Sequence, residues 1–388
     1  MRNGFDTVEE FWTSQNIQQA KNLAGSNSLG DYTSEFANFL GLKHKNLWLM
    51  PSGHQGLEWL LKIKRNARNV VLVPVFNCSV VEDGIRAAGC QPQLYDFSPG
   101  PGVFNWDRLI EQINPSVGAL IVTHYFGVPT DFRPVIEYCR CHGITIIEDC
   151  AHTLGGAIDH QQAGTLGDAS IFSFNYDKPI SLGWGGLAVI NSPAAFDINQ
   201  IPEYRVPSID LEMSLLGDFV VSMAVRRKMI PRQNTLVMRI LRRAHLIRSG
   251  RFLKDAQISV GAAQAELGRW CLSQYQSVVE RRNANACSVA NSISLPSWPV
   301  GASVKPAWVK QKIFIKDEKK MALTKSQCQK SGFRVGNFNW PNLIGGVTQS
   351  DFPIASEVAT KWVDIPVHQN LDAKSLDEML KLLKQVNT

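Results

Sequence analysis

The sequence predicts an α/β protein with a large, mostly parallel sheet flanked by helices, followed by a smaller C-terminal α+β domain. Two observations carry this prediction. Between residues 47 and 191, short apolar runs alternate with segments of helical periodicity, and each run is continuously apolar, as in strands buried on both faces. After about residue 200 the alternation stops, and a long helical stretch leads to a final strand and helix.

The first half of the chain alternates strand and helix in a regular order. We expect strands at residues 47–50, 70–76, 91–97, 118–126, 144–149, 169–174 and 185–191. We expect two of the intervening helices to end at Gly89 and Gly143, since glycine commonly follows the last helical turn. In open sheets of this kind, ligands bind at the carboxyl ends of the strands. Ser52, Asp149 and Lys178 fall at such ends in this interpretation.

The second half of the chain lacks this regular alternation of strands and helices. Residues 261–293 are expected to form one long helix, and a strand near Trp362 leads into an amphipathic helix capped by Asp372 or Ser375. We place the domain boundary near residue 255. The expected domains are 1–255, which includes a basic helical segment at 211–254, and 256–388.

The composition excludes several classes of protein. The chain has 388 residues, of which 44% are hydrophobic and 19% charged, which is too apolar for a disordered chain. We find no secretion signal and no apolar run long enough to span a membrane, so we expect a cytoplasmic protein with reduced cysteines. Cys139, Cys141, His142 and Cys150 lack the paired spacing of a metal knuckle, and we predict no metal site.

Three features carry the chemistry. The turn SGHQG (52–56) precedes a helix expected to begin at Ser52 or Gly53, and helix N-termini bind phosphate. The buried strand ending in Glu148 and Asp149 places a carboxylate where it needs a strong partner. Lys178 lies between two apolar strands, where burial lowers the pKa of an amine and favours a nucleophile. A phosphate site, a carboxylate and a buried lysine are what pyridoxal 5′-phosphate (PLP) requires.

The sequence resembles the DegT/DnrJ/EryC1/StrS family of fold type I PLP-dependent sugar aminotransferases. THYFGVPTD (123–131) is similar to the family pattern V-H-x-x-G-x-P-x-D, and IIEDCAHTLGG (146–156) to I-E-D-x-A-Q/H-x-x-G. GTLGDASIFSFNYDKPISLGWGG (164–186) is similar to the family's lysine-bearing motif. GAAQAELGRW (261–270) and IPVHQNL (365–371) resemble weaker C-terminal signatures.

The resemblance implies a role for each matching residue. Lys178 would form the Schiff base and move the proton during transfer, and Asp149 would pair with the pyridine nitrogen. His152 would contact the side of the ring that carries the hydroxyl. The remaining residues implied to bind the cofactor, mainly at its phosphate, are Ser52, Gly53, His54 and Ser173. We interpret His124 as a structural histidine.

The sequence departs from the family at two cofactor positions. Cys78 stands where an aromatic residue usually stacks on the ring, so stacking is weakened, supplied by another residue or replaced by a sulfur contact. His54 replaces the usual threonine or serine, which removes a hydroxyl donor and adds an imidazole.

The resemblance implies an aminotransferase that moves an amino group, most simply from glutamate, to a keto or aldehyde sugar in polysaccharide or amino-sugar biosynthesis. The sugar would be nucleotide-linked or a sugar acid, and the enzyme would be a homodimer. One alternative is a PLP-dependent sugar dehydratase, although such relatives carry histidine at the position of Lys178. The other is a non-catalytic PLP-binding regulatory homologue.

The excess positive charge lies in one segment. Residues 216–254 contain ten basic side chains and a single acid, Asp218, whereas the whole chain has a net charge of +6. Interleaved apolar residues predict one or two basic amphipathic helices. Three roles are consistent with such helices. They would pack on the surface of the protein, cover an anionic substrate as a flap, or contact an anionic membrane surface. No nucleic-acid-binding motif is present, so we expect no nucleic-acid partner.

Overall fold

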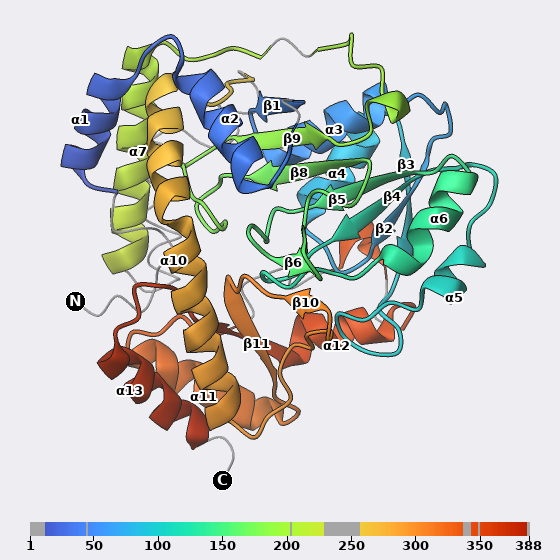
Figure 1. Cartoon of the computed structure of the whole chain (residues 1–388). Coiled ribbons are helices and arrows are strands. Elements are labelled where there is room, and N and C mark those ends of the chain that lie inside the picture. The colour runs from blue at the N-terminus through green and yellow to red at the C-terminus, as the bar shows by residue number, and fades with distance from the viewer. Residues whose placement is uncertain are drawn as a thin grey trace.

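The computed structural model describes residues 12–43, 46–201, 204–228, 257–336, 343–347 and 350–385. These residues form a large unit around a seven-stranded sheet and a C-terminal α+β unit, which are joined by one long helix (Figure 1). The predicted α/β class is confirmed. The expected domain boundary near residue 255 lies outside the described residues.

The seven-stranded sheet has the order β1-β9-β8-β5-β4-β2-β3. Its strands are β1 Leu47–Met50, β2 Val70–Pro74, β3 Gln91–Tyr95, β4 Val117–Thr123, β5 Thr145–Asp149, β8 Ala169–Ser173 and β9 Gly186–Ile190. The contiguous strands from β3 to β8 pair in parallel, whereas β9 runs antiparallel to β8 and β1. The mostly parallel sheet therefore places the ends of β5 and β8 at the same edge.

Helices cover both faces of this sheet, because side chains that alternate along each strand enter different cores. Ala119 and Ile121 of β4 pack on the side of α3 and α4, whereas Leu120 and Val122 pack on the side of α5 and α6 (Figure 1). The bounds of these helices are α3 Gly53–Ile63, α4 Ser79–Ala87, α5 Trp106–Ile110 and α6 Arg133–Cys141.

Several predicted strands extend too far at their carboxyl ends. The strand expected at residues 118–126 ends at Thr123, because the chain then turns tightly and Tyr125 exchanges backbone hydrogen bonds with Val128. Phe126 and Gly127 both have positive φ, at 59° and 95°. The strand expected at 91–97 likewise ends at Tyr95.

A helical layer packs against the β8–β9 side of the sheet. Its helices are α1 Ser14–Leu23, α2 Ser28–Phe39, α7 Ile209–Lys228 and α10 Ala262–Ser292. The predicted long helix is α10, which contacts α1, α2 and α7 in its first half. Helix α7 contains the start of the predicted basic segment, and residues 229–256 of that segment lie outside the described residues.

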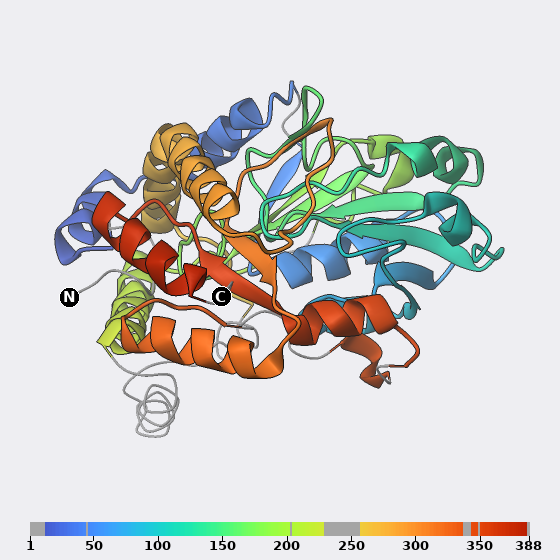
Figure 2. The same cartoon turned by 90° about the horizontal axis from the view of Figure 1, so that it is seen from below.

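The C-terminal unit is a two-stranded sheet with three helices. Its elements are β11 Lys310–Phe314, α11 Glu318–Lys330, α12 Pro353–Lys361, β12 Trp362–Pro366 and α13 Ala373–Lys384. Asp372 caps α13, as predicted, by accepting a hydrogen bond from the Ser375 amide at 2.6 Å. Figure 2 shows β11 and β12 between the C-terminal helices and the large sheet. Within the described residues we find no helix with the length and apolarity needed to cross a bilayer.

The C-terminal unit is tethered to the large unit through the turn at Phe126 and Gly127. The backbone amides of Ala307 and Val309 donate to Gly127 O and Phe126 O at 2.7 and 2.9 Å. A three-stranded ribbon of β6 Ala157–Ile158, β7 Gln161–Gln162 and β10 Val304–Lys305 joins the same region. This turn thus positions β11 relative to the large sheet.

We predict that Gly127→Ala lowers the free energy of unfolding by roughly 3 kcal/mol or more, since the added Cβ would clash with Ala307 O and the backbone is left-handed. Gly41→Ala is the matched control, because Gly41 has a similar φ of 72° with open space around it. That control should lose only about 1 kcal/mol. Urea unfolding measures the free energy of unfolding of both variants. Equal losses would contradict the role of Gly127 in joining the two units.

Candidate active site

A cavity of about 430 Å³ lies at the carboxyl ends of the central strands. Its walls come from the β1–α3 turn, the start of α4, the end of β5 and the β8–β9 loop. All eight residues predicted for the site line it: Ser52, Gly53, His54, Cys78, Asp149, His152, Ser173 and Lys178. The structure therefore brings the predicted residues together, and their individual roles stay predictions.

The β1–α3 turn forms a cup suited to a phosphate. Ser52 caps α3 by accepting a hydrogen bond from the Gln55 amide at 3.3 Å, which leaves the first amides of α3 directed at the cavity edge. A Cβ at position 53 would lie 3.2 Å from Ser173 Cβ, so the glycine lets this helix start in close contact with β8. His54 Nδ1 lies 3.0 Å from Ser52 Oγ. The turn, Ser173 and His54 thus converge on one side of the cavity.

Asp149 lines the same cavity from the end of β5. It is 4% exposed and accepts a hydrogen bond from the Ala151 amide at 3.0 Å. Burial raises the pKa of Asp149, and the Ala151 amide and the positive charge of Lys178 partly offset that effect. A buried carboxylate in this position is suited to a cationic N–H partner.

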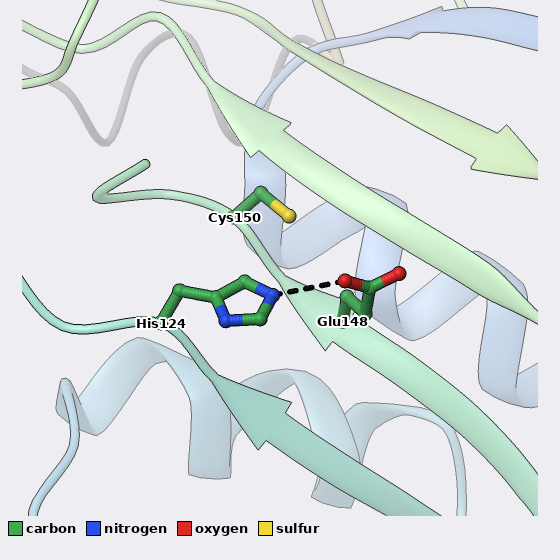
Figure 3. Close-up of side chains that lie close together, drawn as sticks. All are labelled: His124, Glu148 and Cys150. Atoms are coloured by element: carbon green, nitrogen blue, oxygen red, sulfur yellow. Dashed lines mark hydrogen bonds and ion pairs between the residues drawn. The ribbon is translucent and has the colours of Figure 1, made fainter. Parts of the chain in front are cut away.

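Glu148 points to the other face of β5 and is closed off from the cavity by hydrogen bonds (Figure 3). His124 Nε2 lies 2.9 Å from Glu148 Oε2, and His124 Nδ1 accepts from the Thr130 amide at 3.0 Å, so His124 is neutral and donates to Glu148. Glu148 also accepts hydrogen bonds from the amides of Gly164, Leu166 and Gly167.

This network explains why the side chains of His124, Glu148 and Cys150 lie close together. Their potential ligand atoms lie within 4.8 Å of one another (Figure 3). Four N–H donors already engage the two oxygens of Glu148, and both ring nitrogens of His124 are engaged. The arrangement is that of a structural network that anchors residues 164–167, in agreement with the interpretation of His124 as structural.

Lys178 enters the cavity from the β8–β9 loop. Its side chain is 14% exposed, and Nζ lies 3.6 Å from Asp177 Oδ1. Helix α10 holds this loop: Gln264 Nε2 donates to Leu182 O at 2.7 Å, and the buried Arg282 guanidinium lies 3.4 Å from Pro179 O. The loop is therefore fixed from outside the cavity, with Lys178 directed inward.

His152 forms part of the wall between the two units. It is 3% exposed, and its ring centroid lies 6.2 Å from that of Phe126. Burial, followed by the positive charge of Lys178, lowers the pKa of His152 well below its ordinary value. The imidazole is therefore neutral at pH 7.

Cys78 lines the cavity at the start of α4, where the family usually has an aromatic residue. Its position is set by Asn77, whose side chain accepts from the Cys78 amide at 2.7 Å and donates to Thr123 Oγ1 at 2.8 Å. Trp184 also lines the cavity and is fixed by a hydrogen bond from its indole to Ser259 O at 3.1 Å.

Sequence reasoning missed Asp177. Its carboxylate lies beside Lys178, and it lines the same cavity. An acid directly before the lysine of the motif was the signal that could have found it.

A sequence model of the DegT/DnrJ/EryC1/StrS aminotransferase family matches residues 7–217, which is more than half of the chain. The chain belongs to this family. PLP is the cofactor of the DegT/DnrJ/EryC1/StrS aminotransferases, and similar solved structures include a PLP form and a pyridoxamine phosphate form.

Curated relatives cover part of the chain. GDP-perosamine synthase of Vibrio cholerae is 29% identical over 167 residues, which cover 43% of this chain and 45% of that protein. Protein MosB of Rhizobium meliloti is 33% identical over 141 residues, or 36% of this chain and 28% of that protein. The matched region therefore covers less than half the length of each of these two relatives.

Solved structures match the fold over the whole chain. The aminotransferase TlmJ from Streptoalloteichus hindustanus superposes with a TM-score of 0.73 at 18% identity, covering 100% of this chain and 99% of that one. A sugar aminotransferase, Spr1654 from Streptococcus pneumoniae, gives a TM-score of 0.74 at 15% identity, covering 98% and 97%. At these identities the likeness establishes the family fold.

The cavity of this family member fits PLP. The close approach of Gly53 to Ser173 forms a cradle that a Cβ would fill, which leaves room for phosphate oxygens at the start of α3. Asp149 supplies a buried carboxylate for a pyridinium N–H, and Lys178 supplies a primary amine in the same cavity.

We predict that His152→Gln makes the protein less sensitive to acid. The unfolded chain protonates this histidine below about pH 6.5, whereas the folded protein keeps it neutral, so folding loses stability as the pH falls. Between pH 7.5 and 5.5 this residue accounts for a loss of about 1 kcal/mol. Urea unfolding at both pH values should show a smaller loss in His152→Gln than in wild type. The exposed His160, changed to Gln, is the control, and an unchanged loss in His152→Gln would refute the prediction.

Proposed function

We propose that the protein is a PLP-dependent aminotransferase that moves an amino group from an amino acid, glutamate in the simplest case, to a keto or aldehyde sugar. The observation that carries the proposal is the convergence of Lys178, Asp149 and the α3 cup on one cavity. The names of relatives, such as GDP-perosamine synthase and a UDP-N-acetyl-3-dehydro-alpha-D-glucosamine 3-aminotransferase, support the sugar as acceptor. The pathway is then polysaccharide or amino-sugar biosynthesis.

Bound PLP supplies an electron sink for the bond that breaks at the reacting carbon. The residues of the chain supply position and proton transfer. Asp149 holds the proton on the ring nitrogen, and the N-terminus of α3 with Ser173 orients the phosphate. Lys178 Nζ anchors the cofactor and then takes and returns the proton of the reacting carbon. Asp177 Oδ1 lies 3.6 Å from this amine.

We also propose a cytoplasmic homodimer, as the family resemblance implies. Leu23 on α1 and Trp270 on α10 are 61% and 46% exposed, and these two helices pack side by side. Large apolar side chains on adjacent surface helices support a protein interface on this face. Light scattering of the purified protein distinguishes a dimer from a monomer.

We predict that the purified protein is yellow and that borohydride fixes the cofactor to the wild-type chain. Lys178→Ala should lose this covalent attachment, because no amine replaces Nζ, and activity should fall at least about 1000-fold. Mass spectrometry measures the attachment. Lys316→Ala, at an exposed lysine, is the control and should behave as wild type.

Three outcomes would redirect the proposal. A colourless protein that takes up no PLP would overturn it. Release of ammonia from a sugar substrate without net amino transfer would favour the dehydratase. Bound cofactor that reacts with no amino acid would favour the regulatory homologue.

A further inference from the structure

A buried ammonium group of the C-terminal unit lies behind the cavity that Lys178 and Asp149 line. It belongs to Lys312 in the middle of β11, whose side chain is completely buried. A charge in such a place requires strong partners, because burial removes the water that would otherwise hydrate it. The contacts of this ammonium fall into two groups, one within the C-terminal unit and one with the large unit.

The first group holds the ammonium in place relative to its own sheet. Lys312 is paired in register with Asp364 of β12, and Nζ lies 3.1 Å from Asp364 Oδ1. Nζ also donates a hydrogen bond to Trp362 O at 3.3 Å. Both partners belong to the neighbouring strand, so the position of the ammonium is set by the β11–β12 sheet (Figure 2).

The second group consists of two aromatic rings of the large unit. Nζ lies 4.9 Å from the centroid of the Phe126 ring and 5.9 Å from that of the Phe76 ring. Both rings are buried, and their centroids are 6.3 Å apart. A cation within about 6 Å of a ring centroid is attracted to the negative face of the ring, and the attraction is stronger where both are desolvated. One charge of the C-terminal unit therefore contacts two rings of the large unit.

Each of these rings lies behind a different wall of the cavity. The Phe126 ring is 6.2 Å, centroid to centroid, from the ring of His152, which lines the cavity after β5. Phe76 directly precedes Asn77 and Cys78, which line the cavity after β2. The ammonium thus touches the support of both walls at once.

The backbone next to each ring is fixed by hydrogen bonds. Tyr125 Oη donates to Phe76 O at 3.0 Å, and the Val309 amide donates to Phe126 O at 2.9 Å. A phenyl ring has no hydrogen-bonding group of its own, so these bonds leave its side-chain torsions to its packing neighbours. Lys312 is the neighbour that adds a directional attraction to this packing.

We propose that Lys312 is a positioning residue of the cofactor site. Its ammonium holds the rings of Phe76 and Phe126 and through them sets the spacing between the Cys78 wall and the His152 wall. Cys78 fills less space than the aromatic residue usual in the family, so contact with a cofactor ring depends on how closely the two walls are held. The inference rests on the cavity as the site of PLP and not on which reactants the enzyme takes.

The experiment measures the visible circular dichroism of bound PLP and the Kd for PLP. Lys312→Met removes the charge and keeps an unbranched side chain that adapts to its surroundings. The dichroism band should change in intensity, and the Kd should rise about fivefold or more, because a desolvated cation–π contact is lost. Lys312→Met also leaves Asp364 buried without its ion pair, which lowers stability. The double variant Lys312→Met/Asp364→Asn removes both charges and should show the same changes in dichroism and Kd.

Asp364→Asn alone is the matched control, because it removes the ion pair and leaves the amine of Lys312 against the two rings. It should lower the free energy of unfolding in urea but keep the dichroism of wild type and a Kd within roughly twofold of it. Lys316→Met, at an exposed lysine just after β11, should leave the dichroism, the Kd and the stability unchanged.

A double-mutant cycle tests whether Lys312 acts through the rings. Phe126→Leu removes one of them, so adding Lys312→Met to Phe126→Leu should raise the Kd for PLP by a smaller factor than adding it to wild type. Equal factors in the two backgrounds would contradict the positioning role.

Two further results would overturn the proposal. One is a wild-type dichroism band and Kd in both Lys312→Met and the double variant with Asp364→Asn. The other is an equal change in Lys312→Met and in Asp364→Asn, since loss of the ion pair would then account for it. Wild-type protein that binds PLP and reacts with no amino acid would contradict the proposed function, and it would leave this test intact.

Discussion

Two adjacent carboxylates at the end of β5 determine how the active site is built. Because side chains alternate across a strand, Glu148 and Asp149 point to opposite faces of the sheet. Glu148 is held by His124 and three backbone amides, which also fixes the loop that leads into β8. With Glu148 satisfied, β5 cannot shift by one residue without burying an unpaired carboxylate, so Asp149 is directed into the cavity.

The cavity is electrostatically divided by the elements that surround it. The N-terminus of α3 presents the positive end of a helix, and Asp149 presents a buried carboxylate. A cofactor with a phosphate and a basic ring fits these two regions, and both belong to the large unit.

Much of the large unit was predictable, because its strands are apolar runs, glycines follow helices α4 and α6, and its motifs lie within single strand–loop–helix segments. Asp149, Lys178 and Gly53 were found in this way. Helices α1 and α2 were not predicted, since their sequences are largely polar and they are stabilised by packing against α10. The surroundings of Lys312 could not be predicted, because they depend on how β11 docks at Phe126 and not on any local pattern. The separate duties of Glu148 and Asp149 likewise required the three-dimensional positions of the amides at 164–167.

Helix α10 binds the loop that carries Lys178 at two points 18 residues apart in the helix, through Gln264 at its start and Arg282 in its second half. Three residues further on, Asn285 donates to the carbonyls of Val367 and His368, just after β12. Lys178 and the C-terminal unit are therefore both positioned by the same helix. For protein engineering, a chimera joined between Gln264 and Arg282 would take the two anchors of one loop from different parents. Recombination that exchanges the C-terminal unit while keeping both anchors of the loop from one parent would have to place its junction after Arg282.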